Sequence, residues 1–375
     1  VSLSARAFFP IIFERRAGPG AGKLPMAVVG RRSGSAYLRS DLRHLSWILA
    51  DRRTACPETS DIPSGIIARG ILPFLALPTQ TCGLAAGCAH CAVVTADREL
   101  VCFGHNNHGQ CSVPARLGPI AAVAASVGHT CAVRHDGRLV CFGNNSQGQC
   151  TVPPGLGPVV AVAAGVGHTC AVRLDGRLVC FGANNAGQCT VPASVGPVAA
   201  VAAGRFHTCA VRLDGQLVCF GHNGHGQCTV PANLGPVVAV AAGVGHTCAL
   251  RPDGQLVCFG QNSHGQCTAP ADLGPVVAVA AGAGHTCAVR PDGSLVCFGG
   301  NKAGQCTVPA GLGSVVAVAA GTGHTCAVRP DGQLVCFGQN GHGQCIVPPG
   351  LKPLGVQGGV SCALVPDGPL QEPTS

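Results

Sequence analysis

Histidine and cysteine are the residues of this chain whose types and spacing could do chemistry. One set is His168, Cys170, Cys180 and Cys189, and equivalent residues return every 39 residues over most of the sequence. A histidine with three cysteines can bind zinc, the imidazole can act as a base, and two of the thiols can form a disulfide. Which of these is expected depends on the elements that hold the four residues.

The spacing within one repeat does not favour a zinc site or a catalytic base. Cys189 lies nine residues beyond Cys180, and no Cys-x-x-Cys pair accompanies it in this repeat. The recurring histidines share one environment, whereas a catalytic group needs a distinct neighbourhood. We therefore predict no catalytic residue, no cofactor and no metal. The histidines are predicted to bond backbone groups in a turn between strands, and the third cysteines to pack between neighbouring repeats.

The first two cysteines of a repeat fit a disulfide across a β-hairpin. Leu174-Asp175-Gly176 suits a three-residue hairpin loop, which places Cys170 opposite Cys180. The pairs predicted in this way are Cys131–Cys141, Cys170–Cys180, Cys209–Cys219, Cys248–Cys258, Cys287–Cys297 and Cys326–Cys336. In the first repeat Ala92, and not Cys91, faces Cys102. Because that repeat lacks the pair, reduced cysteines are tolerated, which favours the cytoplasm or nucleus and leaves secretion open.

These residues sit in a strict repeat that begins near Thr81. Its histidines are His90, His129, His168, His207, His246, His285 and His324, each 39 residues from the next. Each copy contains three short strand-like segments, such as residues 159–164, 168–173 and 177–182, followed by a connection rich in Gly, Asn and Pro. The segments are apolar on both faces, as expected for small sheets stacked between neighbours. A truncated eighth copy begins at Gly355.

Seven equal units without capping repeats predict closure into a ring. We therefore predict an all-β protein, a seven-bladed β-propeller of three-stranded or four-stranded blades over residues 81–370. Residues 1–80 are predicted to be a mostly irregular, partly disordered extension with a short helix at 41–53, and residues 371–375 a tail. A β-solenoid is the less favoured architecture. The truncated eighth copy either pairs with an N-terminal strand to close the ring or hangs from a ring of seven.

The charge lies mainly in the extension. The formal net charge is +8, and residues 1–80 contribute eleven Lys/Arg against five Asp/Glu, so the repeats are nearly neutral. They lack the basic stripe and the stacking aromatics that nucleic-acid binding requires. No apolar run approaches the roughly 18 residues that a membrane span needs. We expect neither a nucleic acid nor a membrane as partner.

The phrase AAG-x-x-HTCAV-x-x-DG-x-LVCFG-x-N-x-x-GQC, from about Thr81 to Gly368, resembles the repeat of the regulator of chromosome condensation family. The resemblance implies a seven-bladed propeller with compact repeats. It also implies protein partners, because the family includes nucleotide exchange factors for a small GTPase, substrate-recruiting modules of HECT ubiquitin ligases, UV-B receptors and inhibitors of other proteins. UV-B perception depends on clustered Trp, which the repeats lack. A small GTPase or a ubiquitin-pathway component is therefore the partner that the resemblance suggests.

Function is expected where the copies differ. Arg205 and Phe206 replace the Gly-x-Gly pattern of other copies, and an aromatic residue beside an arginine is typical of binding hot spots. The other candidates are loop residues between the aromatic-Gly and Gly-Gln-Cys segments, namely His105, His108, His222, His225, His264, Lys302 and His342. The sequence thus predicts a non-enzymatic protein-binding propeller that serves as a scaffold or recruits substrates. The alternatives are an exchange factor for a small GTPase and, third, a metal-binding Cys/His repeat protein.

Overall fold

The computed structural model describes residues 83–354, which belong to the second of the two units into which the chain divides, Pro63–Ser375. The extension 1–80 with its predicted helix, the tail 371–375 and the eighth copy from Gly355 onward lie outside the described residues. Apart from one short 3₁₀ turn, η2 (Ala193–Val195), the regular elements within 83–354 are β-strands. No helix in this part of the chain is long and apolar enough to cross a membrane.

Each repeat forms one antiparallel sheet of three strands, joined in sequence order. The first strands are β1 (Leu84–Ala86), β4 (Ile120–Ala125), β7 (Val159–Ala164), β10 (Val198–Ala203), β13 (Ala239–Ala242), β16 (Ala278–Ala281) and β19 (Ala317–Ala320). The second strands are β2 (His90–Val94), β5 (His129–Arg134), β8 (His168–Arg173), β11 (His207–Arg212), β14 (His246–Leu250), β17 (His285–Val289) and β20 (His324–Val328). The third strands are β3 (Leu100–Gly104), β6 (Leu139–Gly143), β9 (Leu178–Gly182), β12 (Leu217–Gly221), β15 (Leu256–Gly260), β18 (Leu295–Gly299) and β21 (Leu334–Gly338).

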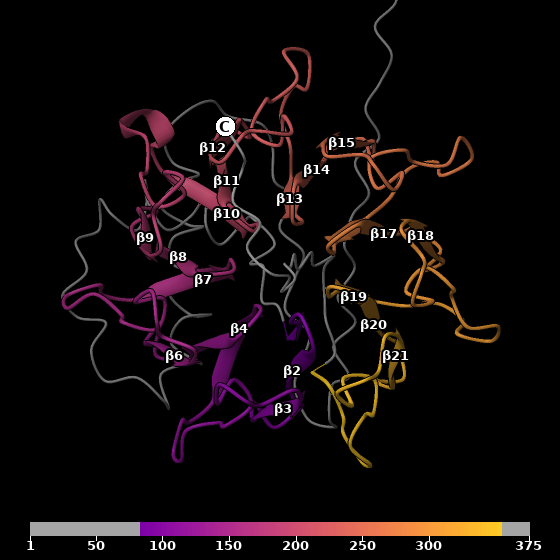
Figure 1. Cartoon of the computed structure of the whole chain (residues 1–375), viewed down its shortest axis with the longest axis horizontal. Helices are drawn as coiled ribbons and strands as arrows, with labels where there is room; N and C mark the ends of the chain where they lie inside the picture. Colours follow the sequence, from indigo (N-terminus) through magenta and orange to yellow (C-terminus); the bar gives the residue numbers. More distant parts are fainter. Residues whose placement is uncertain (1–82, 355–375) are drawn as a thin grey trace, which may run out of the picture. The chain divides into compact units, whose positions relative to one another are not determined.

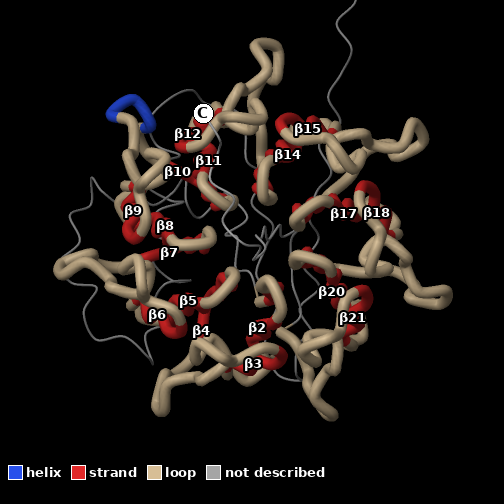
Figure 2. The backbone as a smooth tube through the Cα atoms, in the orientation of Figure 1, coloured by secondary structure: helices blue, strands red, loops and turns tan. Residues whose placement is uncertain are grey.

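The sheets are blades of a ring (Figure 1). We number them in chain order from blade 1 (β1–β3) to blade 7 (β19–β21). The first strand of each blade lies nearest the centre and the third lies outermost, with the connecting loops projecting around the rim (Figure 2). The predicted seven-bladed propeller is confirmed, and the blades within 83–354 have three strands, not four.

The predicted hairpin register is also confirmed. Cys170 lies opposite Cys180, the amide of Arg173 donates to the carbonyl of Arg177 at 2.9 Å, and Gly176 has a φ of +81°. Blade 1 shows the predicted exception, because Ala92 lies opposite Cys102. Turn chemistry that is local in sequence therefore fixed which residues of each hairpin face one another.

The hydrophobic core lies between neighbouring blades. Between blades 3 and 4, for example, Cys170 and Val172 share a buried cluster with Val201 and Ala210. The first strands are made almost wholly of Ala and Val, and the second strands combine Cys, Ala and Val with a buried His and Thr. Burial on both faces explains why these strands lack polar alternation. Small side chains allow seven sheets to approach one another around a common centre.

The ring closes at a seam between blades 7 and 1. Leu84 and Cys91 of blade 1 share a buried cluster with Cys326 and Val328 of blade 7. Leu354, just before the truncated copy, adds to this closure, because its amide donates to the carbonyl of Val94 at 2.7 Å. Pro353 also forms an antiparallel bridge with Thr95 of blade 1. Which of the two arrangements the eighth copy adopts stays a prediction, because that copy lies outside the described residues.

Candidate functional site

One face of the ring carries the turns and loops in which the copies differ. In blade 3 the turn before β8 and the loop after β9 lie at the same end of the sheet, because His168 pairs with Gly182. The Asp-Gly hairpin turn lies at the opposite end. We call the first end the loop face and the second the hairpin face.

A buried histidine of each blade below the loop face reaches the next blade. Nε2 of His90 lies 2.9 Å from Oγ1 of Thr130, and the same contact, at 2.9–3.1 Å, joins blades 1 to 6 to their successors. Thr130 Oγ1 in turn donates to the carbonyl of Gln110 in blade 1 at 2.8 Å. The histidines were predicted to bond backbone groups within their own turn. That prediction is wrong, because Nε2 instead bonds a side chain of the neighbouring blade.

This arrangement fixes the tautomer of the histidines. The single hydroxyl proton of Thr130 is donated to Gln110, so Thr130 accepts the proton of Nε2–H. Nδ1 of His90 is buried and has no hydrogen-bond partner within residues 83–354. Burial, followed by the charges of His324, His129 and His105, lowers the pKa of His90 to about 3, so the ring is neutral. The recurring histidines are therefore part of the frame that joins neighbouring blades.

Blade 1 breaks the pattern at the seam, because Cys91 stands where the other blades have threonine. Its Sγ lies 3.3 Å from Nε2 of His324 and donates to the carbonyl of Gln344 at 3.3 Å, so sulfur replaces the hydroxyl in the same chain of contacts. The same sulfur lies 3.3 Å from Sγ of Cys326. Burial raises the pKa of the Cys91 thiol.

The paired cysteines fall into two groups. The structure contains the disulfides Cys131–Cys141, Cys248–Cys258 and Cys326–Cys336. In the other three predicted pairs, Cys170–Cys180, Cys209–Cys219 and Cys287–Cys297, the residues face one another as free thiols. The register that brings the sulfurs together is the same in all six blades, so the difference lies in the bond and not in the backbone.

The third cysteine of each repeat is part of the outer loop and not of the packing between blades. Sγ of Cys189 donates to the carbonyl of Ala183 at 3.2 Å, within the same repeat, and its equivalents do the same. Burial raises the pKa of Cys189 to about 12 and that of Cys150 to about 11, so both are thiols at neutral pH. Asn184 closes the same loop by accepting from the amide of Cys189 at 2.8 Å.

Arg205, Phe206, His222 and His225 come together on the loop face of blade 4. The guanidinium of Arg205 lies over the ring of Phe206 at 5.0 Å from its centroid, and Phe206 lies 6.5 Å from the ring of His222. His222 is 6.1 Å from His225. Partial burial, followed by the neighbouring charges of His225, His207 and Arg205, lowers the pKa of His222. We call these four residues the blade 4 cluster.

Arg205 differs from most other arginines of the propeller. Arg134, Arg173 and Arg212, for example, pair with the aspartate of their own hairpin turn at 3.0–3.1 Å. Arg205 has no ion pair within residues 83–354. Its Nε is buried without a hydrogen-bond partner there, as is the Nε of Arg134 and of Arg173, so the difference lies in the missing ion pair. A guanidinium with unused donors beside an aromatic ring is suited to a carboxylate brought by another molecule.

The remaining candidates are divided. His105, His108 and His342 gather over the seam, with ring centroids 4.7 Å apart for His105–His342 and 6.2 Å for His105–His108. His264, in the loop of blade 5, lies beside Gly284 in the turn of blade 6. Lys302 is exposed on the loop of blade 6. The candidates therefore form two separate clusters and two single positions, all on the loop face.

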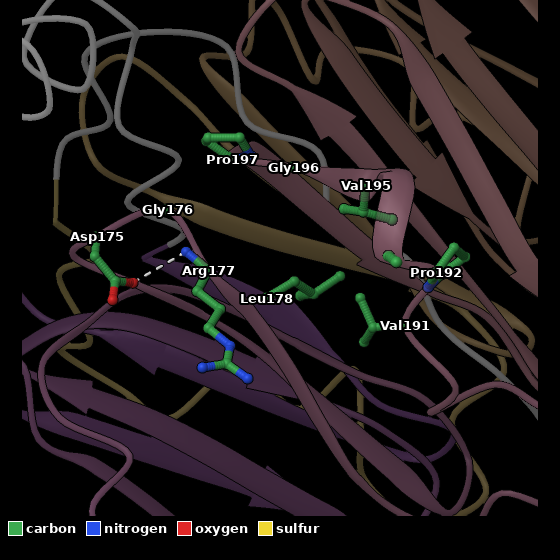
Figure 3. Close-up of a pocket in the computed structure, with 10 residues that line it drawn as sticks. Asp175, Gly176, Arg177, Leu178, Val191, Pro192, Val195, Gly196 and Pro197 are labelled. Atoms are coloured by element: carbon green, nitrogen blue, oxygen red, sulfur yellow. Dashed lines mark hydrogen bonds between the residues drawn. The ribbon is translucent and has the colours of Figure 1, made fainter.

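The hairpin face has hollows, but they repeat. A hollow of about 510 Å³ lies between the turn Asp175–Gly176 and the η2 loop up to Pro197 (Figure 3), where Asp175 Oδ1 accepts from the amide of Arg177 at 3.0 Å. An equivalent hollow of about 550 Å³ lies between Asp136 and Pro158 in blade 2. Because the lining is the same turn and loop, the hollow belongs to the repeated frame and offers no unique constellation.

Sequence comparison places this geometry in a family. The regulator of chromosome condensation (RCC1) repeat matches residues 120–149, 159–188, 198–227, 237–266, 276–305 and 315–344. The chain belongs to the RCC1 repeat family. The six matched RCC1 repeats fall on blades 2 to 7, and the seventh sheet, blade 1, is the repeat with Cys91 in place of threonine. No curated protein sequence matches the chain.

Solved structures share the RCC1 propeller fold at low identity. The ectodomain of the receptor kinase CR4 from Physcomitrella patens has a TM-score of 0.60 at 22% identity, covering 68% of this chain and 73% of that one. Human WBSCR16 has a TM-score of 0.57 at 20% identity, with 66% and 86% covered. Prp20p from Saccharomyces cerevisiae has a TM-score of 0.52 at 17% identity, with 64% and 80% covered.

Sequence reasoning missed the role of Cys91 in the RCC1 ring. We interpreted the first repeat as one that lacks a disulfide, although Cys91 stands one period before Thr130 and so occupies the threonine position. That alignment was the available signal. The repeat also contains a Cys-x-x-Cys pair, Cys88 and Cys91, but only Cys91 joins the sulfurs of blade 7.

Proposed function

We propose that this RCC1-repeat propeller binds another protein through its loop face, with the blade 4 cluster as the anchor, and that it has no catalytic activity of its own. The observation that supports this most is the unpaired guanidinium of Arg205 over Phe206. Residues of this kind dominate binding free energy when they enter a pocket of the partner. The partner expected from this chemistry presents a carboxylate beside an apolar surface.

The rest of the loop face supports a binding role over a chemical one. The buried histidines are hydrogen-bonded across blades, and the third cysteines are thiols within loops. What distinguishes one blade from another is the exposed residues, such as His225 and Lys302, which vary the surface without changing the frame. Variation on a rigid scaffold is typical of interaction modules.

The experiment replaces the anchor with the residues of another blade. The double variant Arg205→Val, Phe206→Gly reproduces the Gly-Val-Gly turn of blade 5, so the backbone has a native precedent. The matched control is Arg177→Ala on the hairpin face. Affinity capture with quantitative mass spectrometry should find at least one protein that is retained by the wild type and by R177A and is lost by at least about tenfold from the double variant. Equal recovery of every partner by all three proteins would discard the anchor.

Nucleotide exchange on a small GTPase is the second candidate. It follows from the family and from Prp20p, whose structure is described with its binding properties to Gsp1p and histones. At 17% identity this likeness concerns the fold alone. Measuring nucleotide release from a panel of small GTPases separates the two functions, because acceleration of one of them would favour exchange, whereas a pure binding module leaves every rate unchanged.

A further inference from the structure

Three sulfurs meet at the seam. Sγ of Cys91, Cys326 and Cys336 lie within 4.8 Å of one another, and no other group of three His, Cys, Asp or Glu ligand atoms within residues 83–354 is as close. Cys91 and Cys326 are fully buried, and Cys336 is half-buried on the outer strand. Nε2 of His324 lies 3.3 Å from Sγ of Cys91. Three sulfurs therefore lie close together between the first and last blades, and one imidazole nitrogen contacts the sulfur of Cys91.

The grouping is specific to the seam because of one residue. In blade 5 the partner of Cys248 across the blade interface is Oγ1 of Thr286 at 3.6 Å, and in blade 4 the partner of Cys209 is Oγ1 of Thr247 at 3.5 Å. A neutral hydroxyl is a poor ligand for a soft metal. Only blade 1 presents a thiol at this position, so only blade 7 meets a third sulfur.

We propose that the reduced protein binds a thiophilic metal ion, Zn²⁺, at the seam, with Cys91, Cys326, Cys336 and His324 as ligands. Thiolates and imidazole are the preferred ligands of zinc, and four of them without a coordinated water make a structural site. The site would connect blade 1 to blade 7 and so join the two ends of the repeat array. This inference is independent of the loop face and of the function proposed for it.

The metal and the Cys326–Cys336 disulfide use the same two sulfurs and exclude each other. Reduction of the disulfide takes two electrons and two protons and yields two thiols, with an added phosphine as the reductant in the experiment. Zinc binding then releases one proton from each of the three thiols as the metal–sulfur bonds form. His324 binds the metal through the lone pair of Nε2, so its proton lies on Nδ1. In the other blades the proton lies on Nε2.

The first test removes the third sulfur without introducing a new type of residue. Cys91→Thr restores the residue that the other blades carry, and with it the threonine–histidine contact, so folding has a precedent in six interfaces. The proteins are reduced with a phosphine, loaded with zinc and passed over a weak competing chelator. The wild type is expected to retain about one equivalent of zinc and C91T none. Equal retention by the two proteins, or none by the wild type, would overturn the proposal.

The second test changes equivalent cysteines in two blades. Cys336→Ser removes a proposed ligand, whereas Cys219→Ser removes its counterpart in blade 4, where Thr247 replaces the third sulfur. Zinc is expected to be lost from C336S and kept by C219S, and zinc should raise the melting temperature of C219S but not of C336S. With Co²⁺ as probe, sulfur-to-cobalt absorption should appear in the wild type and C219S. The same loss of metal from both serine variants would also contradict a site confined to the seam.

Discussion

Sγ of Cys91 lies 3.3 Å from Nε2 of His324, at the position where the six other blade interfaces have a threonine hydroxyl. A thiol accepts a hydrogen bond from imidazole more weakly than a hydroxyl does. In metal-free protein, with a chelator present, Cys91→Thr is therefore expected to raise the free energy of unfolding by about 0.5–1.5 kcal/mol. Urea unfolding of wild type and variant measures the difference. A clear loss of stability would show that the seam has adapted to sulfur.

Thr169 accepts from Nε2 of His129 and donates to the carbonyl of Gln149, and all of these atoms are buried. Thr169→Val keeps the shape of the side chain and removes both bonds. Because a buried donor and acceptor then lack partners, we expect a loss of about 1–3 kcal/mol in unfolding free energy. Thr190→Val, in an exposed loop, is the control and should change it by less than about 0.5 kcal/mol. Similar losses in both variants would argue against the inter-blade role.

Gly182 follows Phe181 at the end of β9 in blade 3 and has a φ of +103°. A Cβ at this position would meet the carbonyl oxygen of Gly167 and the Cα of His168, both of which are backbone atoms. Gly182→Ala is therefore expected to destabilise the propeller by about 3 kcal/mol or more. Gly187→Ala is a matched control, because its φ of +79° is also positive but nothing lies within 4 Å of the added carbon. Gly187→Ala should lower the free energy of unfolding by about 1 kcal/mol. The melting temperature of G182A should therefore lie below that of G187A, and the reverse order would contradict the steric explanation.

Leu354 closes the ring by bonding Val94 and packing against the core shared by blades 1 and 2. Leu354→Ala removes most of that packing and should lower the free energy of unfolding by about 2 kcal/mol. Leu174→Ala serves as the control, since Leu174 lies exposed in a hairpin turn. Chemical denaturation of the two variants provides the comparison. An unchanged midpoint for L354A would mean that blade 1 closes without this segment.

Acid is expected to unfold the propeller through its buried histidines. The pKa values of His90, His129, His246 and His324 are lowered to about 3, chiefly by burial. In the unfolded chain these groups bind protons below pH 6.5, whereas the folded state does not until about pH 3. Stability is thus full above pH 6.5 and falls as the pH falls toward 3, by about 1.4 kcal/mol per pH unit for each histidine.

The urea midpoint at pH 7, 6 and 5 measures this dependence. His129→Gln keeps an N–H donor near Thr169 but cannot titrate, so its midpoint should fall less steeply with pH. A midpoint that is constant from pH 7 to pH 5, or an equal slope in both proteins, would contradict the assignment of the acid sensitivity to these side chains.

The sequence by itself determined the blade. The 39-residue period set the number of units, and the Asp-Gly turn set the register that places Cys170 opposite Cys180. Both are local, since the turn and the two strands that it joins lie within about 15 residues of one another. The apolar character of both strand faces predicted stacked sheets for the same reason. The candidate loop residues were also placed at one end of the blades by their position between strand and turn.

What lies between blades was decided only by the tertiary structure. His168 was predicted to serve its own turn, but its partner is Thr208 of the next blade, 40 positions away. Cys91 and His324 are separated by 233 positions, and only closure of the ring brings them into contact. The repeated sequence shows which residues each blade contains. Which residues of blade 1 meet those of blade 7 depends on the number of blades that close the ring. The seam, where the pattern fails to repeat, is for that physical reason the part that sequence reasoning could not place.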